Sequence, residues 1–168
     1  ETPHGRVRAE IVVRATEGYS PMLPGHRRVL APVYSLMLAT QPLPPAFWAG
    51  VGLTRRETFA DFRHLIIYGQ RTEDGRFAFG GRGAPYHFGS RVRAAYDREP
   101  AVFTELARVL RELFPDLGPA EVTHTWGGPI GVPRDWFASV GLDRQTGLAW
   151  AGGYNIIAIP LAAGVLAP

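Results

Sequence analysis

The segment HTWGGPIGVPRDW, residues 124–136, constrains the fold more than any other part of the chain. Glycines and prolines interrupt it repeatedly, so a long helix is excluded. The segment is also a poor linker, because the indoles of Trp126 and Trp136 are costly to leave in water. It therefore predicts a place where bare backbone lies among large aromatic side chains.

The composition is typical of a single globular domain with a hydrophobic core. The chain has 168 residues, of which 46% are hydrophobic and 20% charged. All 18 basic residues are arginines, and the formal net charge is only +3. The arginines are scattered and accompany no recognition motif, so we expect no nucleic-acid partner.

Residue usage also bears on the compartment. The chain has no cysteine, which excludes disulfide and thiolate chemistry and fits a reducing, cytoplasmic location. The N-terminus does not read as a signal peptide. The apolar C-terminal run NIIAIPLAAGVLAP is too short to cross a bilayer and is interrupted by Pro160. We therefore expect no membrane partner.

Hydrophobic periodicity predicts strands with few helices between them. The predicted strands are 5–16, 29–43, the hairpin 64–81 around Asp74-Gly75, a strand from Glu121 to Trp126, and two short strands flanking 143–147. One clear amphipathic helix is predicted over 99–115. A capping box at Thr54–Glu57 predicts a second, short helix through Phe59 and Phe62. This pattern indicates an α+β fold with a mainly antiparallel sheet and flanking helices.

Several common kinds of active site find no support. There is no G-x-S-x-G nucleophile elbow, no phosphate-binding glycine fingerprint, and no His or carboxylate at metal-ligand spacing. What remains is a set of glycine-rich segments edged with aromatics and arginines: FGGRGAPYHFGSR (79–91), TWGGPIG (125–131) and WAGGY (150–154). Each is open to two interpretations, a tight turn with core aromatics or a wall for a flat ligand. Three such segments in one chain favour a planar ligand.

The sequence resembles the FAD-dependent oxidoreductases of the D-amino acid oxidase superfamily, of the glycine, sarcosine and amine oxidase type. Four segments carry the resemblance: AEIVVRAT, PVYSLMLATQPLP, LIIYGQRTEDGRFAFGG and THTWGGPIGVPRDWFASVGLDRQTGLAWAGGY. They are similar, in that order, to the last strand of the FAD domain, the first long strand of the substrate domain, a hairpin of that domain, and the return toward the flavin. Together they cover most of residues 5–154.

The resemblance implies a substrate-binding domain and a set of contacts with FAD. Residues 1–18 would end the FAD domain, 19–125 would form the substrate domain, and 126–168 would return toward the FAD domain with a divergent tail. The implied cofactor-binding residues are Ala15, Thr16, Trp126, Gly127, Gly128, Gly152, Gly153 and Tyr154. Four further residues, chosen from the chemistry of their segments, are candidates for binding substrate: Tyr34, Arg82, Tyr86 and His87.

The implied reaction is the oxidation of an amine or amino-acid C–N bond by hydride transfer to the flavin, followed by hydrolysis of the imine. The flavin carries the difficult chemistry, and no catalytic base is assigned. The sequence departs from the family by lacking the N-terminal Rossmann half, which binds the pyrophosphate. An alternative function is therefore a non-catalytic binding or interaction domain that has lost the FAD-binding half. A surface that once faced FAD would then predict self-association.

Overall fold

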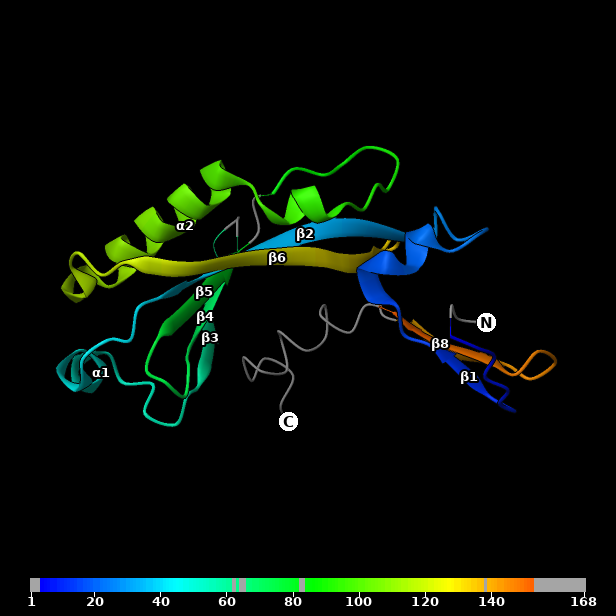
Figure 1. Ribbon diagram of the computed structural model, residues 1–168, viewed down its shortest axis with the longest axis horizontal. Helices are drawn as coiled ribbons and strands as arrows, with labels where there is room; N and C mark the ends of the chain where they lie inside the picture. Colours follow the sequence, from blue (N-terminus) through cyan, green and yellow to red (C-terminus); the bar gives the residue numbers. More distant parts are fainter. Residues whose placement is uncertain (1–3, 62, 64–65, 82–83, 138, 153–168) are drawn as a thin grey trace.

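The computed structural model describes residues 4–152 except 62, 64–65, 82–83 and 138. It contains two sheets joined by the long strand β6 and the loop after it (Figure 1). The strands are β1 (Val12–Arg14), β2 (Leu30–Thr40), β3 (Thr58–Ala60), β4 (Ile67–Arg71), β5 (Phe77–Gly81), β6 (Val122–Pro133), β7 (Ser139–Asp143) and β8 (Leu148–Gly152). The α-helices are α1 (Pro45–Val51) and α2 (Pro100–Leu113), and three 3₁₀ helices are η1 (Glu17–Met22), η2 (Ala94–Asp97) and η3 (Pro115–Leu117).

The larger sheet has five antiparallel strands in the order β3-β4-β5-β2-β6. The longest pairing joins β2 to β6 along nearly their whole lengths, from Leu30 opposite Pro133 to Thr40 opposite Val122. This arrangement confirms the α+β fold with a mainly antiparallel sheet. It also shows that the strand predicted for residues 121–126 continues to Pro133, through the glycines and prolines, so the expected domain boundary after residue 125 falls inside β6.

The smaller sheet has the order β1-β8-β7, with β1 parallel and β7 antiparallel to β8. It confirms the two short strands predicted around the turn at Asp143. The strand predicted for residues 5–16 is wrong in extent, because only Val12–Arg14 pairs with β8. Figure 1 shows this sheet beyond the end of β6, away from α1 and α2.

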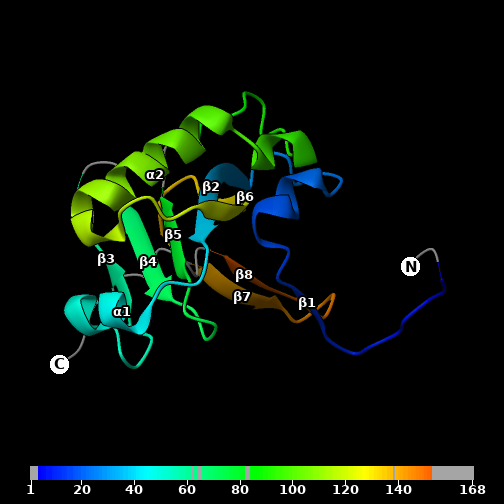
Figure 2. The same cartoon turned by 60° about the vertical axis from the view of Figure 1, so that its left-hand side comes forward.

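The hydrophobic core lies between the larger sheet and its two helices. The apolar stripe predicted for α2 buries Leu106, Val109 and Leu110 against β2 and β5. Phe77 and Phe79 of β5 are fully buried, and Phe77 packs against aromatic rings of α1 and of the segment that follows α2. Both α-helices therefore cover the same face of the sheet (Figure 2). The amphipathic pattern was sufficient to predict α2 because its buried residues repeat with the helical period.

The capping box at Thr54–Glu57 does not begin a helix, and the prediction there was wrong. Arg56 has a positive φ of 60°, and the carboxylate of Glu57 accepts the backbone N–H of Arg55 within a turn. The chain then enters strand β3. The helix lies earlier in the chain, where Pro45 occupies its first turn and suits it because that position needs no N–H donor.

The hairpin of β4 and β5 confirms the predicted turn. Gly75 has a φ of 79°, a conformation that glycine adopts without strain. The Asp74 carboxylate accepts hydrogen bonds from Thr72 and Arg76, and these bonds lower the pKa of Asp74. The Arg76 guanidinium also donates to the Thr40 carbonyl and the Thr123 hydroxyl, at 3.1 and 2.9 Å. The turn is thereby tied to the adjoining ends of β2 and β6.

Adjacent glycines of β6 have different surroundings. A Cβ on Gly127 would collide with Leu36, which is fully buried, and would lie 3.1 Å from the Asp97 carbonyl oxygen. A Cβ on Gly128 would meet nothing within 4 Å. Gly127 is therefore needed for close packing, whereas Gly128 borders open space.

We expect Gly127→Ala to lower the free energy of unfolding by about 2 kcal/mol, because overpacking a buried site forces neighbours to shift. Gly128→Ala is the matched control and should change it by less than about 0.5 kcal/mol. Chemical denaturation of both variants measures the difference. Equal losses in the two variants would contradict the packing described for Gly127.

Candidate functional site

One face of the larger sheet is not covered by a helix in the described part of the chain, and we call it the open face. In an antiparallel sheet, residues directly opposite each other point to the same side. The register pairs Met37 with both Trp126 and Gly80, pairs Tyr68 with Gly80, and pairs Ser35 with Gly128. Because Leu36 and Leu38 belong to the core, their alternate neighbours lie on the open face. Its central residues are Ser35, Met37, Tyr68, Gly80, Trp126 and Gly128.

A bare glycine allows two side chains to lie flat across the middle of the open face. A Cβ on Gly80 would lie 2.6 Å from the Met37 Cγ and 2.9 Å from the Tyr68 Cε2. The phenol of Tyr68 thereby reaches over β5 and hydrogen-bonds with the hydroxyl of Ser35 on β2. Ser35 is buried, and Tyr68 is half-buried. The face thus offers a hydrogen-bonding pair beside an apolar thioether.

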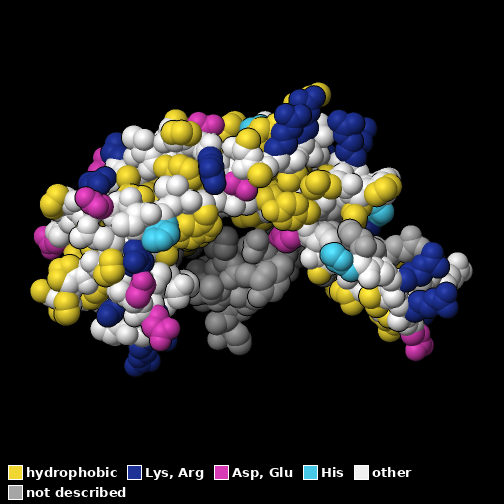
Figure 3. Space-filling model, viewed as in Figure 1, with side chains coloured by type: hydrophobic (Ala, Val, Ile, Leu, Met, Phe, Trp, Pro, Cys, Tyr) yellow, Lys and Arg dark blue, Asp and Glu magenta, His cyan; other side chains and the backbone are white. Residues whose placement is uncertain are grey.

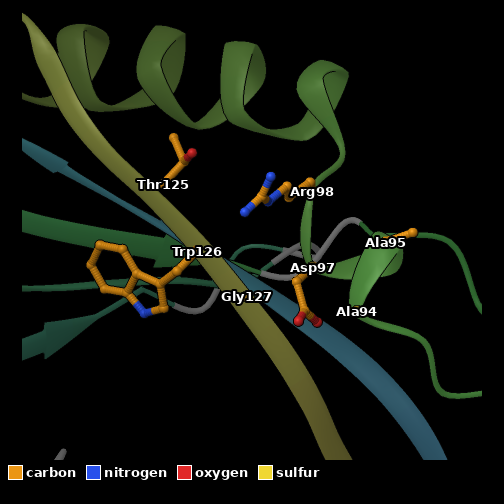
Figure 4. A pocket seen from close by; sticks show the side chains of 7 residues that line it. All are labelled: Ala94, Ala95, Asp97, Arg98, Thr125, Trp126 and Gly127. Carbon is orange, nitrogen blue, oxygen red and sulfur yellow. The ribbon is translucent and has the colours of Figure 1, made fainter.

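Trp126 and Gly128 form the neighbouring part of the open face. The Trp126 side chain is 42% exposed, and Figure 4 shows its indole on the side of β6 opposite to Thr125 and α2. Because a Cβ on Gly128 would meet nothing within 4 Å, the indole lies next to accessible backbone. Gly127, which was predicted to bind the cofactor together with Trp126 and Gly128, faces the helices instead.

Ala15, Thr16 and Gly152 are brought together at the other sheet. β1 and β8 run parallel with Arg14 opposite Trp150, so Ala15, Thr16 and Gly152 follow at adjoining carboxyl ends. The hydroxyl of Thr16, directly before η1, hydrogen-bonds with the hydroxyl of Ser20 in η1 at 2.8 Å. Carboxyl ends of parallel strands are where nucleotide ligands bind in open α/β sheets. Among the described residues, Trp126 and Gly128 therefore lie on the larger sheet, and Ala15, Thr16 and Gly152 lie at the end of the smaller one.

Tyr34, a predicted substrate residue, lies on the helix-covered face. Its side chain is 1% exposed, and its hydroxyl both donates to the Arg93 carbonyl at 3.3 Å and accepts the Arg93 N–H at 3.2 Å. Burial, the largest cause, raises the pKa of Tyr34. His87 packs edge-on against Tyr34 and stacks on Tyr96. Tyr34 and His87 together fix the segment before α2 to β2.

Tyr86, also predicted to bind substrate, is exposed next to this cluster. Its hydroxyl accepts the Ser90 N–H at 3.3 Å, and hydrogen bonding to Ser90 is the main cause of the lowered pKa of Tyr86. The structure brings Tyr34 and His87 together, and Tyr86 is next to His87 in the chain. This cluster lies on the side of the sheet opposite to Trp126. Arg82, Gly153 and Tyr154 lie outside the described residues.

Sequence reasoning did not identify Tyr68, Ser35 and Met37. Their strands were predicted, but each residue stood in an apolar run with no signal that separated it from the core. Within the described ranges, no group of three His, Asp or Glu residues is placed to hold a metal ion. Among the same residues, no helix combines the length and the apolar character that a membrane crossing requires.

Comparison with known proteins identifies the family of this chain. The model of the family described as FAD dependent oxidoreductase matches residues 1–167. The probable oxidoreductase OrdL of Rhizobium meliloti (strain 1021) is 29% identical, with 92% of this chain aligned to 33% of OrdL.

Solved structures show the same fold. L-proline dehydrogenase from P. horikoshii is 20% identical with a TM-score of 0.65, and the match covers 92% of this chain and 40% of that protein. Glycine oxidase from Geobacillus kaustophilus is 22% identical with a TM-score of 0.65, and the match covers 98% of this chain and 42% of that protein. The chain therefore spans about a third to two-fifths of the length of these relatives. Because the family model matches nearly the whole length of the chain, this chain belongs to the FAD-dependent oxidoreductases of the D-amino acid oxidase type.

Proposed function

We propose that this chain is the substrate-domain part of an enzyme that binds FAD and oxidises the C–N bond of an amine or amino acid. The observation that carries the proposal is the open face, where Trp126 and Gly128 border free space beside the Tyr68–Ser35 pair. The names of two structural relatives, a proline dehydrogenase and a glycine oxidase, support the substrate class. Because the chain covers only part of its relatives, the activity belongs to the complete protein.

The residues present fit a flavin in two places. Trp126 and Gly128 would hold the ring system, because an indole and a glycine without close neighbours leave room for a flat group. Ala15, Thr16 and Gly152 would lie along the nucleotide portion, at the carboxyl ends of β1 and β8. When bound, FAD would supply hydride acceptance from the carbon next to the substrate nitrogen. Gly153 and Tyr154, in the undescribed part, remain proposed contacts.

The described side chains of the open face would bind and orient the substrate. The Tyr68 hydroxyl hydrogen-bonds with Ser35, so the phenol is held in place and would border the polar part of the substrate. Met37 would cover the apolar part of the substrate and exclude water. Arg82 remains a proposed partner for a substrate carboxylate. Tyr34, Tyr86 and His87 lie on the opposite side of the sheet, so any effect they have on substrate binding would be indirect.

FAD binding can be tested at Gly128. Gly128→Leu should weaken FAD binding at least tenfold, because the new side chain would fill the space proposed for the ring, while leaving stability unchanged. Titration with FAD, followed by visible absorption and flavin fluorescence, measures the effect. Gly50→Leu is the matched control, since a Cβ there also meets nothing within 4 Å. Equal affinity in both variants would place the flavin elsewhere.

Substrate binding can be tested at Tyr68 in the complete enzyme. Tyr68→Phe should lower kcat/KM for the best amine or amino acid about tenfold, the value of a hydrogen bond of roughly 1.4 kcal/mol. Tyr19→Phe, at an exposed tyrosine of η1, should leave kcat/KM unchanged. If the complete protein retains no flavin and oxidises no amine, the alternative of a non-catalytic binding domain is favoured.

Self-association is a separate proposal. Val13 and Leu142 lie opposite position 149 and Val140 lies opposite position 151, so the three residues share one face of the smaller sheet. All three are exposed, Val140 by 86%. Figure 3 shows hydrophobic side chains at the surface of this sheet. Contiguous exposed apolar side chains favour association. We expect Val140→Lys to shift the chain toward monomer in sedimentation velocity at high concentration. An unchanged distribution would show that this face does not mediate association.

A further inference from the structure

A groove of about 480 Å³ lies on the helix side of β6, a size that suits a small ligand. It is formed by η2 and the first residues after it on one side, and by residues 125–127 of β6 on the other (Figure 4). Gly127 forms part of its β6 wall, while Ala94 and Ala95 keep the η2 wall low. The groove therefore backs onto the same stretch of β6 that presents Trp126 to the open face.

Two opposite charges border this groove without a partner. Asp97 is half-buried and Arg98 is exposed, and among the described residues neither side chain takes part in a hydrogen bond or salt bridge. Figure 4 shows the Arg98 guanidinium directed toward Thr125, and the Asp97 carboxylate directed elsewhere, beside Gly127 and Ala94. The two charges are thus available at separate points of one groove.

The wall that carries these charges is held in place. The Tyr34 hydroxyl bonds with both backbone groups of Arg93, directly before η2. Tyr96, inside η2, stacks on His87 and packs edge-on against Tyr34. Because η2 is fixed to β2 in this way, the backbone that carries Asp97 and Arg98 does not have to be ordered when a ligand binds, which lowers the cost of binding.

We propose that this groove binds a free α-amino acid at a site separate from the open face. The Asp97 carboxylate would accept hydrogen bonds from the ligand ammonium group. The Arg98 guanidinium and the Thr125 hydroxyl would donate hydrogen bonds to the ligand carboxylate. The ligand side chain would project into solvent, because the groove is open and its η2 wall is made of alanines. This site does not depend on FAD and goes beyond the proposed oxidation.

The test is a titration of the ¹⁵N-labelled chain with glycine, followed by amide chemical shifts. Glycine should give saturable shifts at Ala94, Ala95, Arg98 and Thr125. Methylamine and acetate, each carrying only one of the two charges, should bind at least tenfold more weakly at the same ionic strength. Alanine and leucine should bind within a few-fold of glycine, because the side chain is not enclosed.

Variants assign the two charges. Asp97→Asn and Arg98→Gln should each weaken glycine binding at least tenfold, and Thr125→Val should weaken it less. Asp116→Asn and Arg55→Gln, at exposed positions away from the groove, are the matched controls and should bind glycine as the unmodified chain does.

Three results would overturn the proposal. They are the absence of saturable shifts, acetate binding as well as glycine, and glycine shifts confined to Ser35, Tyr68 and their neighbours on the open face. The last result would instead support the proposed substrate face, so failure of this inference and failure of the proposed function are distinguishable. Loss of the dispersed spectrum in one variant leaves the other two variants to decide.

Discussion

The pairing of β2 with β6 organises both the larger sheet and the elements that pack on it. It extends from Leu30 opposite Pro133 to Thr40 opposite Val122, and it places a strand with three glycines against a largely buried strand. The core helices rest on one side of this ladder, and the hairpin of β4 and β5 continues the sheet beyond β2. The same strand, β6, leads into the smaller sheet (Figure 1). Trp126, Gly128 and the groove beside η2 all lie along β6.

The period of two along β6 explains why one short segment takes part in two environments. Successive side chains of a strand point to opposite faces. Thr125 and Gly127 consequently face the helices and η2, whereas Trp126 and Gly128 face the open side. Gly127 is bare because Leu36 packs there, and Gly128 is bare with free space beside it. The absence of a side chain at these two neighbouring positions therefore has two different physical consequences: close packing at Gly127 and free space at Gly128.

The two sheets correspond to two proposed parts of a cofactor site. The carboxyl ends of the parallel strands β1 and β8 hold Ala15, Thr16 and Gly152 next to one another, although they are far apart in the chain. η1 follows β1 directly and packs on β6, where the carboxylate of Glu17 accepts the Gly131 N–H. A ligand that extends from one sheet to the other would therefore contact residues fixed by backbone hydrogen bonds. Such preorganisation reduces the ordering cost of binding.

Local patterns in the sequence were enough to predict several of the elements. β2, the hairpin around Asp74-Gly75 and α2 were predictable, because each depends on periodicity or turn chemistry within a few residues. The Thr54 capping pattern was misleading, because four residues of local pattern cannot outweigh the strand pairing that follows. The full length of β6 was also missed, since glycine and proline are unfavourable in strands unless a partner strand compensates.

Which side chains contact one another depends on the long-range pairing of the strands. Tyr68 and Ser35 hydrogen-bond across an intervening strand because Gly80 lies between them, and no local pattern encodes that distance. Tyr34 was separated from Trp126 by the register of β2 and β6, which assigns them to opposite faces. Register is set by long-range pairing and by burial of one face. The sequence alone could therefore indicate the family and the glycine-rich segments, while the sides of the sheet on which they act followed from the pairing of distant strands.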